Sequence, residues 1–108
     1  MLKNFSDDLF ETEIKKEEIS IIKFSAEWCG PCKSLAPILD SLSSSSEYSD
    51  KNISWYHADV ETDAINTASA MGIRGVPTTI VYRAGVEVDR LVGNPGEARI
   101  REFVDKNL

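Results

Sequence analysis

Two strands with a helix between them are the clearest elements in the pattern of apolar and polar positions. The run ISIIKFS at residues 19–25 is β-branched and aromatic without clean alternation, which is typical of a strand covered on both faces. A second such run, NISWYHADV, occupies residues 52–60. A helix is predicted to begin at about Gly30, and Pro37 is expected to kink it. The apolar residues of this helix recur at helical spacing: Leu35, Ile38, Leu39 and Leu42.

The N-terminal segment is predicted to form a short strand followed by a helix. Residues 2–5 make a possible strand, and Ser6 is a candidate N-cap. Acidic residues at positions 7 and 8 would then occupy the first turn, where the helix dipole favours negative charge. This helix is expected to end near Glu17, and its partial apolar face comprises Leu9, Phe10 and Ile14.

The second half of the chain predicts a helix, an antiparallel hairpin and a last helix. The segment at residues 61–72 is predicted to be helical and to end at Gly72. Residues 78–93 contain two strands joined by a tight turn at Ala84-Gly85. Asn94-Pro95 is predicted to form the N-cap and the first position of the final helix. The apolar stripe of that helix comprises Ile100, Phe103, Val104 and Leu108.

The predicted order of elements is β-α-β-α-β-α-β-β-α. The first half requires parallel crossovers and the second half adds an antiparallel edge. We therefore predict an α/β fold with a mixed central sheet of about five strands flanked by about four helices. The chain has 108 residues, of which 42% are hydrophobic and 28% charged. These values indicate one globular domain over residues 1–108, without disorder or a membrane span.

Charge and the N-terminal sequence narrow the classes of function. The net charge is −6, and no clustered basic face is evident, so direct binding to nucleic acid is not expected. The N-terminus lacks the pattern of a secretory signal, and no apolar run approaches the roughly 18 residues that a transmembrane helix needs. We therefore expect a cytoplasmic protein that is not bound to a membrane. In a reducing cytosol a lone pair of cysteines is seldom structural.

The pair Cys29 and Cys32 lies where the first buried strand gives way to a helix. Unpaired N–H groups and the positive end of the helix dipole stabilise a thiolate at Cys29, and Cys32, one turn further on, is expected to be the less exposed thiol. A structural zinc site needs about four ligands, whereas the chain offers two cysteines and His57, unless two chains share the metal. A structural disulfide across so short a loop would restrict the unfolded chain little. Redox chemistry is favoured over both alternatives.

The segment WCGPC at residues 28–32, with IRGVPT at 73–78 and the order of elements, resembles the thioredoxin family over nearly the whole chain. The resemblance implies that Cys29 attacks a substrate disulfide and that Cys32 resolves the mixed disulfide. Gly30-Pro31 matches the dipeptide that is associated with reducing members.

The resemblance also implies a surface that receives the partner protein. Val76-Pro77 matches the cis-proline of the family, whose backbone lies opposite the active site and pairs with the main chain of the substrate. The apolar rim around it would comprise Trp28, Ile73, Val76, Val92 and Gly93. Ordinary packing is the alternative interpretation of Ile73 and Val92.

Position 23 departs from the family pattern, because thioredoxins usually place there a buried aspartate, thought to help deprotonate the resolving thiol, and this chain has Lys23. A buried ammonium is costly unless it pairs, reaches water or loses its proton. Lys23 therefore either extends to the surface without a chemical role or acts as a nearby cation that favours a thiolate. His57 aligns beside the usual acid and either accepts a proton through a water or is an ordinary satisfied residue.

The resemblance implies a monomeric protein disulfide reductase that works by thiol–disulfide exchange. Electrons would come from NADPH through a thioredoxin reductase, and no bound cofactor or metal is expected because the dithiol carries both electrons. An oxidase or isomerase is the alternative enzyme, although the Gly-Pro dipeptide and the missing signal argue against it. The alternative of another class is a binding subunit of a larger assembly, such as a polymerase processivity partner, with secondary redox activity.

Overall fold

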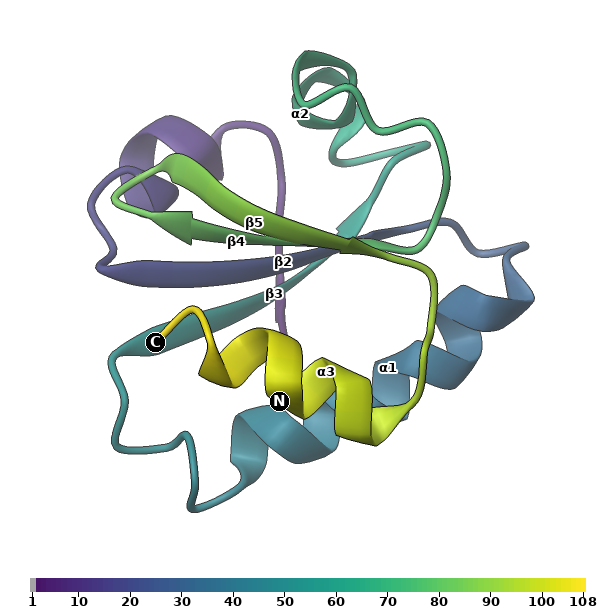
Figure 1. Ribbon diagram of the computed structural model, residues 1–108. Helices are drawn as coiled ribbons and strands as arrows, with labels where there is room; N and C mark the ends of the chain where they lie inside the picture. Colours follow the sequence, from purple (N-terminus) through teal and green to yellow (C-terminus); the bar gives the residue numbers. More distant parts are fainter. Residues whose placement is uncertain (1) are drawn as a thin grey trace.

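Five strands form the centre of the fold in the order β1-β3-β2-β4-β5 (Figure 1). The structure is a computed structural model that describes residues 2–108. The strands are β1 (Lys3–Asn4), β2 (Ile19–Ser25), β3 (Ile53–Asp59), β4 (Thr78–Arg83) and β5 (Val86–Val92). Strand β3 pairs in parallel with β1 and β2, whereas β4 pairs antiparallel with β2 and β5. The predicted mixed sheet is therefore confirmed.

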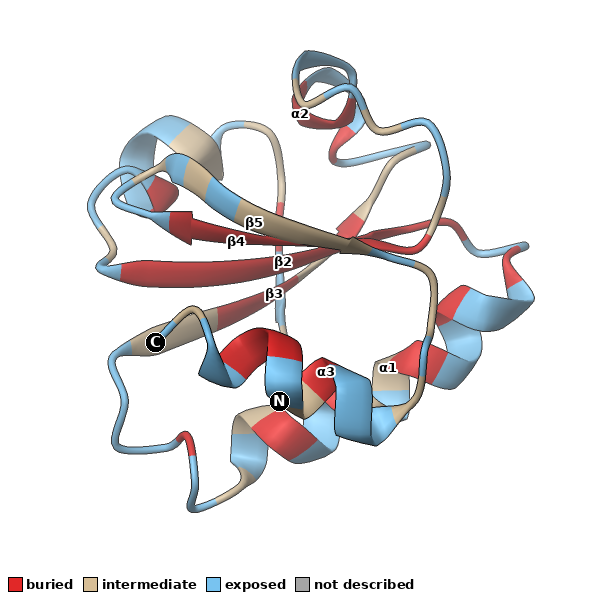
Figure 2. Cartoon of the chain, viewed as in Figure 1, coloured by how far each residue is buried: buried red, intermediate tan, exposed pale blue. Residues whose placement is uncertain are grey.

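Helices cover both faces of the sheet (Figure 1). The helices α1 (Gly30–Ser44) and α3 (Glu97–Asp105) lie on one face, and α2 (Ile65–Ala70) lies on the other with the π-helical turn η1 (Phe10–Ile14). Every residue of β2 is buried, and Figure 2 shows β2 and most of β4 in the colour of buried residues. Along β2, Ile21 packs in the core under α1 and α3, whereas Ile22 and Phe24 pack in the opposite core. This central position explains why the strand is apolar without alternation.

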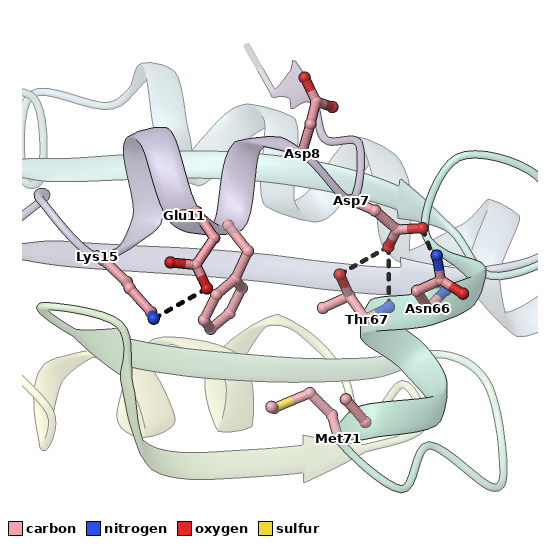
Figure 3. A pocket seen from close by; sticks show the side chains of 9 residues that line it. Asp7, Asp8, Glu11, Lys15, Asn66, Thr67 and Met71 are labelled. Carbon is pink, nitrogen blue, oxygen red and sulfur yellow. Dashed lines mark hydrogen bonds and ion pairs between the residues drawn. The ribbon is translucent and has the colours of Figure 1, made fainter.

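The predicted N-terminal helix is wrong in extent and in its cap. The helical element there is η1, which has five residues and is far shorter than predicted, and no side chain caps that turn. The Ser6 hydroxyl instead donates to the carboxylate of Asp8. The carboxylate of Asp7 accepts hydrogen bonds from the first turn of α2, as Figure 3 shows, rather than facing its own turn. Partners distant in the sequence thus replace the local cap that the pattern indicated.

The later elements agree with the prediction except at their ends. Gly72, with φ of 66°, follows α2, although this helix is shorter than predicted. The hairpin turn has positive φ at Ala84 and Gly85, as a tight turn between twisted strands requires. Helix α3 begins after Gly96 rather than at Asn94-Pro95, and the Asn94 side chain accepts the Gly96 N–H. Leu108 lies beyond α3 and is exposed, so it is not part of the stripe.

Candidate active site

Cys29 and Cys32 lie at the junction between β2 and α1 and are joined by a disulfide, with their Cα atoms 5.2 Å apart. Cys29 is the N-cap of α1, and its Sγ accepts a hydrogen bond of 3.2 Å from the Cys32 N–H. Gly30 and Pro31 open the helix, where the missing N–H of proline is not needed. After reduction, the positive end of this helix of 15 residues stabilises negative charge on Cys29 Sγ.

Both cysteines are buried, with exposed fractions of 5% for Cys29 and 3% for Cys32. Cys32 is the less exposed of the two, as expected, but the difference in exposed fraction is small. The loop before β4 packs against the pair, since the Val76 carbonyl oxygen lies 3.6 Å from Cys29 Sγ. The Val76–Pro77 peptide bond is cis, as the resemblance implied. The structure thus brings two segments that are distant in the sequence together at one sulfur atom.

The rim residues gather in two groups beside this disulfide. Trp28 is 70% exposed, and its Nε1 donates to a Glu61 carboxylate oxygen at 2.9 Å. A cavity of about 180 Å³ separates this indole from the loop, and its lining includes Val60, Ile73 and Val76. Ile73 also packs against the core, which supports the packing interpretation for that residue.

Val92 and Gly93 form the second group, at the end of β5. The Gly93 N–H donates to the Pro77 carbonyl oxygen at 2.8 Å, and Val92 is paired in register with Thr78. Val92 is 66% exposed, so packing in the core does not explain this side chain. Both groups therefore flank the cis-proline loop on an accessible surface.

Lys23 lies in the middle of β2 with only 2% of its surface exposed. It does not extend to the surface, which removes the simplest alternative to a role near the site. Its neighbours in register are His57 on β3 and Thr79 on β4. The ammonium forms no ion pair with any carboxylate of residues 2–108. Burial lowers the pKa of Lys23, and the more distant Asp40 carboxylate only partly opposes this change.

His57 is half-buried, and its Nδ1 lies 3.3 Å from the hydroxyl oxygen of Ser25. Burial lowers the pKa of His57, and the positive charge of Lys23 lowers it further. The carboxylates of Asp59 and Asp40 oppose this lowering without cancelling it. The imidazole is therefore uncharged at neutral pH and has one unprotonated ring nitrogen.

One cavity of about 200 Å³ connects these groups with the second cysteine. Its lining includes Lys23, Ser25, Cys32, His57 and the exposed Lys33. This cavity and the contact between Ser25 and His57 could not be predicted from the sequence, because both depend on how β2, β3 and α1 pack together. Within the described part of the chain, no group of three or more His, Cys, Asp or Glu residues is arranged to hold a metal ion.

Comparison with known proteins agrees with this geometry. The family model for thioredoxin matches residues 1–106. The chain belongs to the thioredoxin family. It is 37% identical to the thioredoxin of Acidithiobacillus ferridurans, over 95% of this chain and 93% of that protein. It is 35% identical to the thioredoxin of Echinococcus granulosus, over 99% of this chain and 94% of that one. A crystal structure of a Malassezia sympodialis thioredoxin superposes with a TM-score of 0.85 at 25% identity, covering 98% of this chain and 90% of that chain.

Membership of the family and the cysteine pair establish the class of activity. The protein is a thioredoxin-type protein disulfide oxidoreductase, and its dithiol carries electrons by thiol–disulfide exchange. Thioredoxins need no bound cofactor for this chemistry, and they act on disulfide substrates with a reductase as partner. The alternative of a binding subunit with secondary redox activity is not favoured. No helix among residues 2–108 is long and apolar enough to cross a bilayer.

Proposed function

We propose that this protein is a general reductant of protein disulfides in which Cys29 attacks and Cys32 resolves. The Cys29 thiolate attacks one sulfur of the substrate disulfide, forms a mixed disulfide and releases one substrate thiolate. The Cys32 thiolate then attacks Cys29 Sγ, which closes the internal disulfide and releases the second substrate thiolate. Two electrons pass from the dithiol to the substrate. The observation that carries this proposal is the position of Cys29 Sγ at the N-terminus of α1, facing the cis-proline loop.

The substrate would lie over the two rim groups. Trp28 and Ile73 line the small cavity beside the cis-proline loop, and Val92 and Gly93 lie at the end of β5 next to Pro77. An extended substrate segment would pair with the main chain at Val76, close to the attacking sulfur. The small apolar cavity beside Trp28 suits a single side chain rather than a deep specific ligand, which is consistent with broad selection of substrates.

Lys23 and His57 would modulate the site from behind the disulfide, and Gly30 and Pro31 would do so from within it. His57 is uncharged and shares the cavity with Cys32, so it is suited to accept the proton of that thiol through a water. The physiological reductant would be NADPH acting through a thioredoxin reductase. We place the protein in the cytoplasm as a monomer with no direct contact with nucleic acid or membrane.

The decisive experiment is the reduction of a protein disulfide, such as those of insulin, by dithiothreitol-reduced protein at neutral pH. This assay needs no reductase partner. We expect rapid reduction by the wild type, none above background by Cys29→Ser, and a trapped mixed disulfide with Cys32→Ser. A Cys29→Ser protein as active as the wild type would refute the proposed roles of the two thiols.

A further inference from the structure

We propose that the buried ammonium of Lys23 selectively stabilises the reduced dithiol and thereby raises the reduction potential of the Cys29–Cys32 pair. This inference rests on the proposed reductase function, and it identifies a residue that sets the reduction potential of the cysteine pair. Reduction adds two electrons to the S–S bond, breaks it and leaves two sulfurs that bind fewer than two protons wherever a thiolate persists. The disulfide is uncharged, so a cation beside it stabilises the reduced state more than the oxidised state.

The position of Lys23 supplies the charge at the right place. Its side chain and Cys32 line the same cavity of about 200 Å³, and the lysine is 2% exposed. Buried charges are screened by salt and water far less than exposed ones. No carboxylate of the described residues forms an ion pair with this ammonium, so its charge is not cancelled locally.

The other charged groups around the cavity do not substitute for Lys23. On β3, His57 is uncharged at neutral pH, and Asp59, which also lines the cavity, is a carboxylate and not a cation and accepts the Glu61 N–H at 2.8 Å. On β4, the neighbour in register is the uncharged Thr79. The remaining charged groups, from α1 and the preceding loop, are exposed: Glu27, Lys33 and Asp40. Of these, the Asp40 carboxylate acts on Lys23, and it only partly opposes the effect of burial.

The effect has a defined dependence on pH. Wherever the reduced pair carries a thiolate, first on Cys29 and at higher pH also on Cys32, Lys23 stabilises that negative charge. At a pH low enough to protonate both sulfurs, the ammonium no longer distinguishes the two redox states. By linkage, ionisation of the thiol raises the pKa of Lys23 by the same amount as the charge of Lys23 lowers the pKa of the thiol. Loss of packing at position 23 would show no such dependence.

The first test is redox equilibrium with glutathione at neutral pH. Lys23→Met should require an about tenfold larger ratio of squared glutathione to glutathione disulfide for half reduction, which equals a potential lower by about 30 mV. The matched control is Lys33→Met, which removes an exposed lysine that lines the same cavity and should change the ratio less than about twofold. Equal ratios for wild type and Lys23→Met would overturn the proposal.

The second test isolates the thiol. In a Cys29→Ser background Cys32 is the single thiol, and its ionisation is followed by thiolate absorbance in the ultraviolet. We expect Lys23→Met to raise the pH of half-ionisation by about one unit and Lys23→Arg, which keeps the charge, to restore it. Unchanged ionisation in Lys23→Met would overturn the proposal. Insulin reduction by the wild type is scored separately, so failure of the reductase function and failure of this inference are distinguishable.

Discussion

The carboxylate of Asp7 accepts hydrogen bonds from the backbone N–H and the hydroxyl of Thr67, at 2.8 and 2.7 Å, across 60 positions of the sequence. Its second oxygen accepts the Asn66 N–H at 3.1 Å (Figure 3). The residue in the N-cap position of α2, Ala64, has no side-chain acceptor. Asp7 therefore caps a helix that belongs to another part of the chain and holds the N-terminal segment against it.

We predict that Asp7→Ala lowers the free energy of unfolding by about 1–2 kcal/mol, because α2 loses its cap. Partial burial opposes ionisation of Asp7, but the hydrogen bonds from Thr67 and Asn66 outweigh it and lower the pKa below 3.8. The carboxylate thus contributes fully above pH 3.8, and its contribution is lost as the pH falls through the lowered pKa. Urea denaturation measures both effects. Asp8→Ala, which removes an exposed neighbour, should change little, and equal losses in the two variants would contradict the prediction.

Lys23→Met should stabilise the oxidised protein by about 1–3 kcal/mol at neutral pH, because a lysine that is 2% exposed and forms no ion pair among the described residues is replaced by an apolar side chain of similar length. The pKa of Lys23 is lowered in the folded state, so the unfolded chain binds more protons between that lowered value and 10.5. The stability of the wild type therefore rises with pH in this window, and its deficit relative to the variant narrows. Guanidinium denaturation at neutral and alkaline pH measures the difference, with Lys33→Met as the exposed control. A difference independent of pH would argue for packing rather than charge.

His57→Gln should flatten the dependence of stability on mildly acidic pH. The pKa of His57 is lowered in the folded state, so between that value and 6.5 the unfolded chain binds the additional proton. The free energy of unfolding of the wild type therefore falls as the pH falls below 6.5. The variant lacks this contribution because it has no imidazole to titrate. Denaturation curves at neutral pH serve as the control, since the two proteins should be similar there. Parallel losses on acidification would exclude His57 as the titrating group.

Glu17→Gln should lower the free energy of unfolding by about 1–3 kcal/mol, because charged acceptors give stronger hydrogen bonds than neutral ones. The Glu17 carboxylate accepts the hydroxyl groups of Ser20 at 2.9 Å, Ser54 at 2.8 Å and Tyr56 at 2.9 Å. Burial and this carboxylate also raise the pKa of Tyr56, so the phenol should ionise at lower pH in the variant. Denaturation and phenolate absorbance measure the two effects. Glu18→Gln, at an exposed neighbouring position, should leave both unchanged.

Trp28→Ala should raise KM for a protein disulfide by about tenfold while changing the reduction of a small aromatic disulfide less, because a large aromatic surface contributes to protein contacts. The control is Val86→Ala, which truncates a similarly exposed apolar side chain, 65% against 70% for Trp28, at the end of β5 opposite to Val92. Steady-state kinetics with both substrates measures the effect. Equal losses with both substrates would place Trp28 in the chemistry of Cys29 rather than in partner binding.

The sequence predicted those parts of the fold that local pattern determines. The strand at 19–25 was predicted with its observed bounds, and the hairpin turn at Ala84-Gly85 needed only turn chemistry. The prediction of an N-terminal helix was wrong because the carboxylate of Asp7 has its partners on α2. Rules that use only neighbouring residues cannot predict so distant a contact. Leu108 fits the helical period, but α3 ends before reaching it.

The candidate site divides in the same way. Cys29 and Cys32 are adjacent enough for spacing alone to indicate their chemistry, and resemblance supplied the cis-proline. The apolar strand around Lys23 left open whether this side chain is buried or extends to the surface. The cavity that Lys23 shares with Cys32 could not be predicted either, because it depends on how α1 packs across β2 and β3. The features of the site that depend on tertiary packing therefore cannot be predicted from the pattern of residues.

The disulfide spans a sequence separation of only three residues. A short peptide that carries WCGPC therefore represents the dithiol of the unfolded chain. Oxidation and unfolding then form a closed thermodynamic cycle, in which the difference between the unfolding free energies of oxidised and reduced protein equals the difference in reduction free energy between folded chain and peptide. Two denaturation curves and one peptide measurement thus give the electrochemical influence of the fold on its sulfurs without any electrode or partner enzyme.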